Sequence, residues 1–111
     1  MNGLDLIIKD LLVKNTKNKL LLEKIAEKTQ SLLIEDIFEI TKIFVAKNAP
    51  IKFETFTLKT FQDNDPEGYF QKILKGFANA LIDISEIDLS EEEEKRINYI
   101  LDNVKIYDKN S

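Results

Sequence analysis

The sequence predicts an all-α fold: a single-domain antiparallel helical bundle of four to five helices over residues 1–107, with a frayed polar tail at 108–111. Apolar residues recur at helical spacing along most of the chain. Only three Gly and two Pro interrupt its 111 residues, and only one segment alternates as a strand would. A chain of this length with 43% apolar residues can build one core and is too short for two.

The first predicted helix covers residues 3–14. Its apolar residues fall at the spacing of one helical face, and Asn2 stands where an N-cap residue can accept a hydrogen bond from the first turn. The result is a short amphipathic helix. Its inward residues are Leu4, Ile7, Ile8, Leu11 and Leu12.

Residues 16–48 contain neither Gly nor Pro and carry one continuous apolar stripe, which predicts one long helix or two. Ser31 can cap a second helix that has two acidic residues in its first turn. We therefore favour two helices, at about 17–29 and 32–47. The second is apolar over much more than one face, so we expect it to be the central and most buried element.

The segment 51–61 follows a helix stop at Pro50 and is ambiguous. Its Thr and Phe content and its two short alternating runs favour a strand. A single strand would leave its backbone groups without partners in one chain. We therefore expect a helix or an irregular packed segment, and strand pairing in a dimer is the alternative.

The next helix is predicted at residues 66–84. Asp65 can act as its N-cap, and Pro66 takes the first helical position, where a missing N–H costs nothing. Gly76 is small enough for a neighbouring helix to approach closely. The inward stripe is formed by Phe70, Ile73, Leu74, Phe77, Leu81 and Ile84.

A last helix is predicted at about 91–105, with its apolar residues again on one face. Ser90 and Glu93 have the spacing of a capping box, in which each side chain accepts from the backbone N–H of the other residue. Two pairs of opposite charge at i,i+4 would each add about 0.2–0.5 kcal/mol. These pairs are Glu91 with Lys95 and Glu92 with Arg96.

The twelve residues from Asp83 to Glu94 carry seven carboxylates and no basic residue. A calcium loop of the EF-hand type needs an oxygen ligand at its fifth position and Gly at its sixth, where this chain has Ile87 and Asp88. We therefore predict no metal site. The second half of the stretch is interpreted as a helix start, and the first half forms a negative corner between the last two helices.

The chain has no His and no Cys, so it lacks the commonest general base, zinc ligands and activated nucleophiles. Its three Gly residues are too scattered to form a phosphate-binding loop. We predict that the protein is not an enzyme, has no catalytic residues and binds no cofactor.

Charge and hydropathy limit the kinds of partner that the sequence allows. The chain has 16 basic and 20 acidic residues, a net charge of −4, and the excess of acid belongs to residues 51–111. This balance disfavours a nucleic-acid partner. No apolar run reaches the roughly 20 residues that span a bilayer, and the N-terminus lacks the features of a signal peptide. We therefore predict no membrane span and a cytoplasmic location.

Two groups of residues are candidates for binding another protein. The first is an aromatic group in the ambiguous segment, which would form a patch if that segment is not fully buried. Its members are Phe53, Phe56 and Phe61. The second lies at the negative corner and along the last helix. Its members are Asp83, Glu86, Asp88, Glu92 and Arg96.

The C-terminal third of the chain resembles the immunity proteins of class II bacteriocins, of the enterocin A type. The resembling features are an apolar helix, a Leu-Ser-acidic start and a final helix. The residues are Ile73, Leu74, Leu81, Leu89-Ser90-Glu91-Glu92 and Ile97 to Leu101. The resemblance implies an antiparallel four-helix bundle that protects a producer cell from its own bacteriocin, with partner specificity in the C-terminal half.

The sequence thus predicts a non-catalytic helical protein that binds another protein, and bacteriocin immunity is the sharpest form of this hypothesis. Two alternatives remain. One is a regulatory or assembly module of phage, plasmid or housekeeping origin, which could form a homodimer that buries the segment from Phe53 to Phe61. The other is an acidic inhibitor that mimics nucleic acid and occupies a basic site on its target.

Overall fold

The computed structural model describes residues 3–14, 16–46 and 57–104. These residues form six α-helices and one short 3-10 helix and contain no strand, which confirms the predicted all-α class. The elements are α1 (Leu4–Val13), α2 (Lys19–Lys28), η1 (Thr29–Ser31), α3 (Ile34–Ala46), α4 (Leu58–Asn64), α5 (Tyr69–Glu86) and α6 (Glu91–Asp102). Within this part of the chain, no helix is both long and apolar enough to cross a bilayer.

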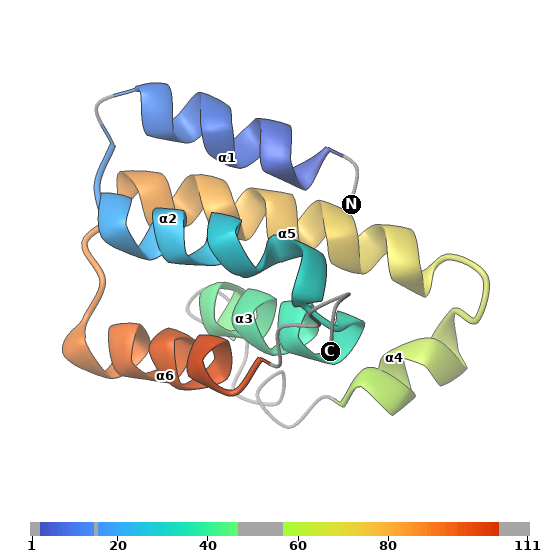
Figure 1. Ribbon diagram of the computed structural model, residues 1–111. Helices are drawn as coiled ribbons and strands as arrows, with labels where there is room; N and C mark the ends of the chain where they lie inside the picture. The colour runs from blue at the N-terminus through green and yellow to red at the C-terminus, as the bar shows by residue number, and fades with distance from the viewer. Residues whose placement is uncertain (1–2, 15, 47–56, 105–111) are drawn as a thin grey trace, which may run out of the picture.

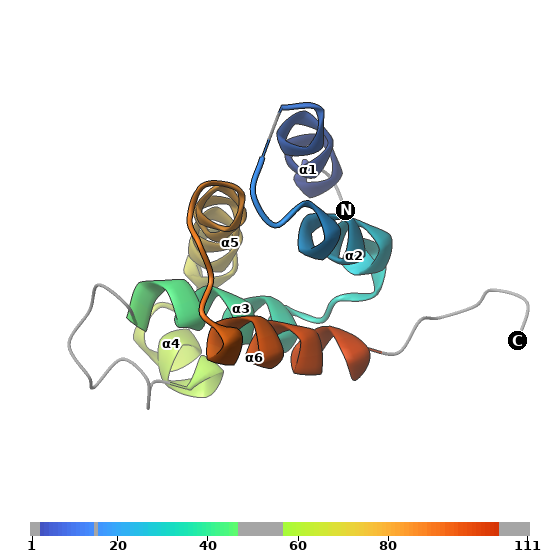
Figure 2. The same ribbon diagram turned by 90° about the vertical axis from the view of Figure 1, so that its left-hand side faces the viewer.

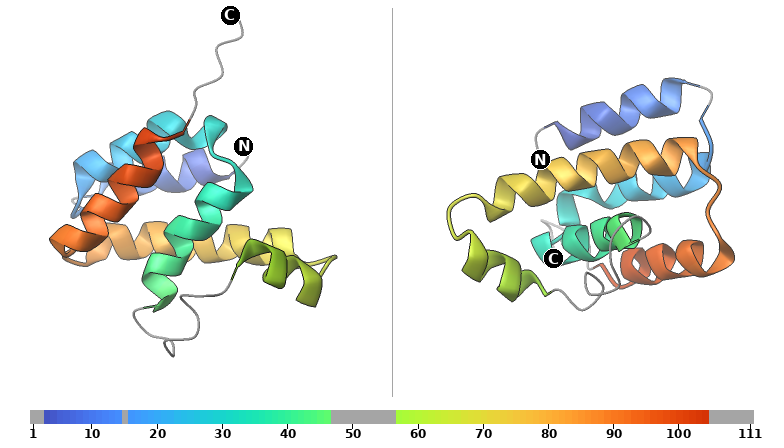
Figure 3. Two further views of the ribbon diagram at one scale, coloured as in Figure 1. Left: turned by 90° about the horizontal axis from the view of Figure 1, so that it is seen from below. Right: turned by 180° about the vertical axis from the view of Figure 1, so that it is seen from behind.

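The helices are arranged in two layers (Figures 1 and 2). α1, α2 and α5 lie side by side, and α2 runs in the opposite direction to the other two (Figure 1). In the second layer, α3 runs across the direction of those three helices: Figure 2 shows α1, α2 and α5 end-on and α3 from the side. From below, α3 crosses α5, and α6 starts near the C-terminal end of α5 (Figure 3). The antiparallel arrangement predicted for the whole bundle is therefore not confirmed for α3.

Among the described elements, α3 and α5 share the most extensive contact. Gly76 of α5 leaves room for this contact, because a Cβ atom built there would lie 3.1 Å from Cγ2 of Thr41, a tight approach. α3 is buried around most of its circumference, which confirms its predicted central position. Its buried apolar residues are Ile37, Phe38, Ile40, Ile43 and Phe44.

The chain between α2 and α3 breaks as two helices, as predicted, but the predicted cap is wrong. Ser31 ends the 3-10 helix and does not cap α3. Instead, Oδ2 of Asp36 accepts a hydrogen bond of 3.0 Å from the backbone N–H of Leu33, the residue before α3. The acidic first turn thus satisfies a backbone donor at the helix start.

At α1 the N-cap position is held by Gly3, with φ of +84°, and Asn2 lies outside the described residues.

α5 begins later than predicted. Oδ1 of Asp65 accepts from the N–H of Gly68 at 3.0 Å and closes the turn that holds Pro66, but the N-cap position of α5 belongs to Gly68 and the regular helix starts at Tyr69. Phe70 was predicted to face inward, and its side chain is 45% exposed. It lies in the first turn of α5, where the helix extends past the ends of α1 and α2 (Figure 1).

The ambiguous segment is helical where it is described. α4 begins at Leu58, and the Thr57 hydroxyl caps it by accepting from the N–H of Thr60 at 3.1 Å. α6 has the predicted start and ends at Asp102, three residues before its predicted end. The predicted tail at 108–111 lies outside the described residues.

Candidate partner-binding surface

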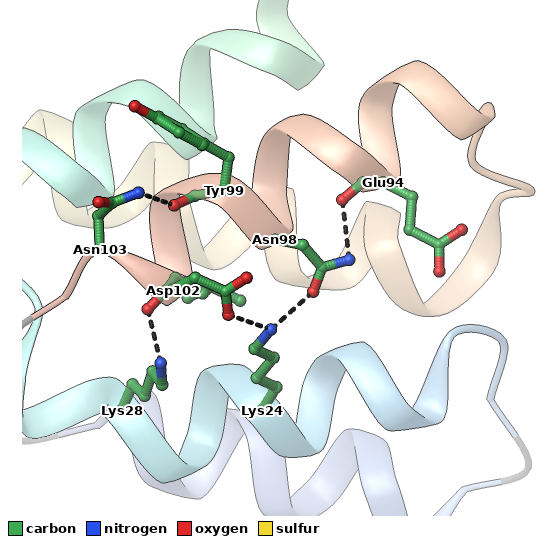
Figure 4. Close-up of polar contacts among 8 residues, drawn as sticks. Lys24, Lys28, Glu94, Asn98, Tyr99, Asp102 and Asn103 are labelled. Carbon is green, nitrogen blue, oxygen red and sulfur yellow. Dashed lines mark hydrogen bonds and ion pairs between the residues drawn. The ribbon is translucent and has the colours of Figure 1, made fainter.

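α6 is fixed to α2 by a set of polar contacts that the sequence analysis did not predict (Figure 4). Nζ of Lys24 lies 2.6 Å from a carboxylate oxygen of Asp102 and donates to Oδ1 of Asn98 at 3.0 Å. One turn further along α2, Nζ of Lys28 donates to the backbone carbonyl of Leu101 at 2.6 Å. We call these contacts the α2–α6 seam.

The charge of the seam is stable near neutral pH. The hydrogen bond from Lys24 to Asp102, reinforced by the positive charges of Lys24 and Lys28, lowers the pKa of the Asp102 carboxyl below its ordinary value of 3.8. The Asp102 carboxylate is therefore ionised at neutral pH. Because the seam joins two helices at successive turns, it fixes the rotation of α6 about its own axis.

The face of α6 next to the seam is exposed. Glu92, Lys95, Arg96 and Tyr99 follow one another at the i, i+3, i+4 and i+7 positions of one helical face, which we call the α6 outer face. Tyr99 is 71% exposed, and its side chain points away from α2 (Figure 4). Tyrosine and arginine are the residue types that carry a large share of the binding energy at protein interfaces.

The two predicted i,i+4 pairs at the start of α6 are not formed. Within the described residues, Glu91 makes no ion pair with Lys95, and Glu92 makes none with Arg96. All four side chains are exposed, where solvent screening and side-chain entropy offset the attraction. The charges of the α6 outer face are therefore open to a partner.

The capping box at the start of α6 is confirmed. Oγ of Ser90 accepts from the N–H of Glu93 at 3.2 Å, and the Glu93 carboxylate accepts from the N–H of Ser90 at 2.8 Å. The second half of the acidic stretch is thus a helix start, as predicted. Its carboxylates also lie at the positive end of the helix dipole.

The negative corner between α5 and α6 is built together with the connection between α1 and α2. Nδ2 of Asn18 donates to the carbonyls of Ile84 at 2.7 Å and Ile87 at 2.9 Å, and the N–H of Lys17 donates to the carbonyl of Ser85 at 3.0 Å. These donors satisfy carbonyl groups that the end of a helix leaves unpaired. Asn18 adopts a left-handed conformation, with φ of +56°, and asparagine tolerates it better than most residues.

The charged residues among the predicted site residues separate into two groups. Asp83, Glu86 and Asp88 belong to the negative corner, where the Asp88 carboxylate pairs with Nζ of Lys17 at 3.1 Å. Glu92 and Arg96 lie on the α6 outer face.

The aromatic candidates do not form an exposed patch in the described residues. Phe61 is half-buried and packs edge-to-face on Phe38, with 6.0 Å between ring centroids. Phe53 and Phe56 lie outside the described residues. Tyr99, the most exposed aromatic side chain of the described part, was not a candidate in the sequence analysis. The sequence did contain a signal for Tyr99: it lies three residues after Arg96, on a polar helical face.

In the described part of the chain, no three Asp or Glu side chains come together as they would around a metal ion. The fold and surface define a small all-helical protein with a negative corner and an outer face that combines an exposed tyrosine with both signs of charge. No family model, no curated protein and no solved structure matches this chain, so the resemblance to bacteriocin immunity proteins stays a prediction.

Proposed function

We propose that this protein is a non-catalytic helical domain that binds another protein through the α6 outer face. The observation that carries the proposal is the exposure of Tyr99 beside Arg96 and Glu92 on one helical face. A tyrosine ring covered by a partner removes a large apolar area from water, and its hydroxyl still finds a polar partner. A tyrosine that is 71% exposed in the free protein offers that area to a partner.

The α2–α6 seam supports this proposal because it orders the helix in advance. A binding face that is already fixed loses less conformational entropy when the partner docks. Lys24, Lys28 and Asp102 hold α6 against α2, whereas the Tyr99 side chain points away from α2, so these contacts orient the helix while the tyrosine stays uncovered (Figure 4).

The charge distribution favours a protein partner over the role of nucleic-acid mimic. Lys95 and Arg96 lie beside Glu92 on the α6 outer face, and Lys17 pairs with Asp88 at the negative corner. A mimic of nucleic acid would need carboxylates that basic residues do not interrupt. Mixed charges suit a protein surface that carries both signs and select among partners.

Bacteriocin immunity remains the sharpest form of the proposal, with the cytoplasm as its location. It rests on the resemblance of α5, the Leu89–Ser90 start and α6 to the immunity proteins. Expression in a bacteriocin-sensitive strain tests it: we expect raised tolerance to one bacteriocin and loss of that tolerance in the Tyr99→Ala variant. Unchanged sensitivity across a broad bacteriocin panel would remove the immunity role and leave the binding proposal standing.

The binding proposal itself is tested at Tyr99. A photo-crosslinking amino acid at position 99 is expected to trap one defined protein in cells, and mass spectrometry identifies it. With that protein purified, calorimetry should show that Tyr99→Ala weakens binding at least about tenfold, because an anchor side chain contributes about 2 kcal/mol or more.

Phe70→Ala is the matched control, since Phe70 is an exposed aromatic residue of a different helix. Its affinity should equal that of the wild type. Equal affinity of the wild type and Tyr99→Ala would exclude the α6 outer face. A crosslinked product that contains two copies of this chain would instead support the homodimer alternative, and sedimentation equilibrium would measure its dissociation constant.

A further inference from the structure

α1 lies at the edge of the molecule and packs mainly on α2 and α5 (Figures 1 and 2). The side of α1 that faces away from these two helices is exposed. Its exposed residues occupy the i, i+3, i+4 and i+7 positions of one helical face, which we call the α1 outer face. They are Leu6, Lys9, Asp10 and Val13.

Two large apolar side chains lie on the α1 outer face. Leu6 is 70% exposed and Val13 is 87% exposed. One exposed apolar side chain is normal on a protein surface and needs no explanation. Two of them seven residues apart fall on one line along the helix, and this is the spacing by which two helices pair along an apolar seam.

The two charged residues lie on opposite sides of that line. A helix turns by about 100° per residue, because about 3.6 residues complete one turn. Viewed along the axis, Lys9 is therefore displaced by about 60° to one side of Leu6, and Asp10 by about 40° to the other side. The α1 outer face thus has an apolar centre, one positive edge and one negative edge.

Both charges are available to a second surface. Lys9 forms no ion pair with any described residue. Asp10 pairs with Lys14 at 3.2 Å, but both side chains are exposed to solvent. An ion pair of this kind contributes little to stability and is easily exchanged for another.

We propose that the α1 outer face binds the same face of a second copy of this chain, with the two α1 helices parallel about a twofold axis. Leu6 then meets Leu6 of the second copy, and Val13 meets Val13. The positive edge of each helix faces the negative edge of the other, so the pair of Lys9 with Asp10 forms twice.

The charges favour this orientation over the antiparallel one. Antiparallel helices would bring the two positive edges together on one side of the seam and the two negative edges together on the other. Like charges in contact disfavour an interface. The α1 outer face is therefore complementary to itself when the helices are parallel, as a twofold interface requires.

The dimer leaves the α6 outer face uncovered, because α6 belongs to the other layer (Figure 2). The inference therefore does not rest on the proposed function, and Tyr99→Ala should leave self-association unchanged. One ten-residue helix from each chain buries less area than a standard interface. We expect a weak dimer, with a dissociation constant on the order of 100 µM.

Charge reversal tests the two edges. Sedimentation equilibrium of the full chain, loaded at up to about 1 mM, should show a mass that rises toward that of a dimer. Lys9→Glu and Asp10→Lys should each weaken self-association at least about tenfold, because two attractive contacts per dimer become repulsive. An equimolar mixture of these two variants, and the double variant, should regain the wild-type affinity. Failure of both to regain it would overturn the charge pairing.

Substitution of Leu6 tests the apolar centre. Leu6→Ser should also weaken self-association at least about tenfold, with an unchanged circular dichroism spectrum. Leu33→Ser is the matched control, because Leu33 is 56% exposed and directly precedes α3 in the other layer. A wild-type chain that stays monomeric, or equal affinity of wild type and Leu6→Ser, would overturn the dimer. A monomer that floats with phosphatidylglycerol vesicles would overturn it too and assign the face to a membrane.

The orientation can be measured because the chain has no Cys. Leu6→Cys and Val13→Cys each introduce a single thiol, and a parallel pair brings equal positions together. Mild oxidation of a mixture of the two variants should therefore link each variant to its own kind. Leu33→Cys is the control for random oxidation and should stay monomeric. A dominant disulfide between position 6 and position 13 would mean antiparallel helices and overturn the proposed pairing.

Discussion

The ammonium group of Lys42 lies in surroundings that suit a charge poorly. The residue is 8% exposed within α3. Its Nζ lies 3.7 Å from a Glu39 oxygen and 5.4 Å from the centroid of the Phe38 ring. The ion pair is longer than a hydrogen bond, and a cation over an aromatic face contributes about 0.5–2 kcal/mol. A lysine is normally a surface residue, so the sequence alone does not predict this burial.

Replacing Lys42 with Met is therefore expected to be neutral or to stabilise the protein by up to about 1 kcal/mol, because an unbranched apolar chain avoids the cost of a desolvated charge. Urea denaturation followed by circular dichroism measures the change. Lys75→Met, at an exposed position of α5, is the control and should stay within about 0.5 kcal/mol of the wild type. Destabilisation by more than about 1 kcal/mol would mean that the Phe38 and Glu39 contacts outweigh desolvation.

At the scale of the element, two serines show what local sequence can and cannot predict. Ser31 and Ser90 both precede helices with acidic first turns, and both were predicted as caps. Only Ser90 caps its helix. Ser90 has Glu93 three residues later, whereas Ser31 has Ile34 there, so only the first can form the reciprocal box. The apolar spacing predicted both α3 and α6. The residue at which each of these two helices starts depended on which side chain caps it.

The difference between the two serines can be measured. Ser90→Ala should destabilise the protein by about 1 kcal/mol, since the N–H of Glu93 loses its acceptor at the start of α6. Ser31→Ala should change stability by less than about 0.5 kcal/mol, because Ser31 caps no helix. Thermal and urea denaturation of both variants provide the comparison. Equal losses would show that the box contributes nothing beyond the loss of a serine side chain.

At the scale of the whole molecule, the arrangement of the helices was less predictable than the helices themselves. An apolar stripe shows which face is buried but not which helix covers it, so the crossing of α3 over α5 was not expected. The broad apolar surface of α3 did predict its central place. The α2–α6 seam was missed because Lys24 meets Asn98 and Asp102, and Lys28 meets the Leu101 carbonyl, only when the two helices lie in one particular register.

The seam gives the fold a pH dependence whose direction follows from Asp102. Its pKa is lower in the folded chain than its ordinary value of 3.8, so its contribution to stability is fully present above pH 3.8 and is lost as the pH falls through the folded pKa. Asp102→Asn should therefore be less stable than the wild type at pH 7, and the difference should vanish in strong acid. Urea midpoints at pH 7, 5, 4 and 3 test this.

Asp63→Asn is the control for the seam, because Asp63 is exposed on α4 and pairs with no described lysine. Its midpoints should follow those of the wild type at every pH. A difference between Asp102→Asn and wild type that persists below the folded pKa would mean that the carboxylate acts through packing rather than through its charge.

The hydrogen bonds of Asn18 also bear on whether the C-terminal half could exist alone. Helices often carry their own terminator, a glycine or asparagine just after the last turn. α5 has Ile87 at that position, and its final carbonyls are met by a side chain that lies 66 to 69 residues earlier in the chain. The terminator of α5 is thus supplied by tertiary structure. A fragment that begins after Asn18 would contain every residue of α5 and α6. It would still lack the Asn18 amide, which binds the last carbonyls of α5 where the chain turns toward α6.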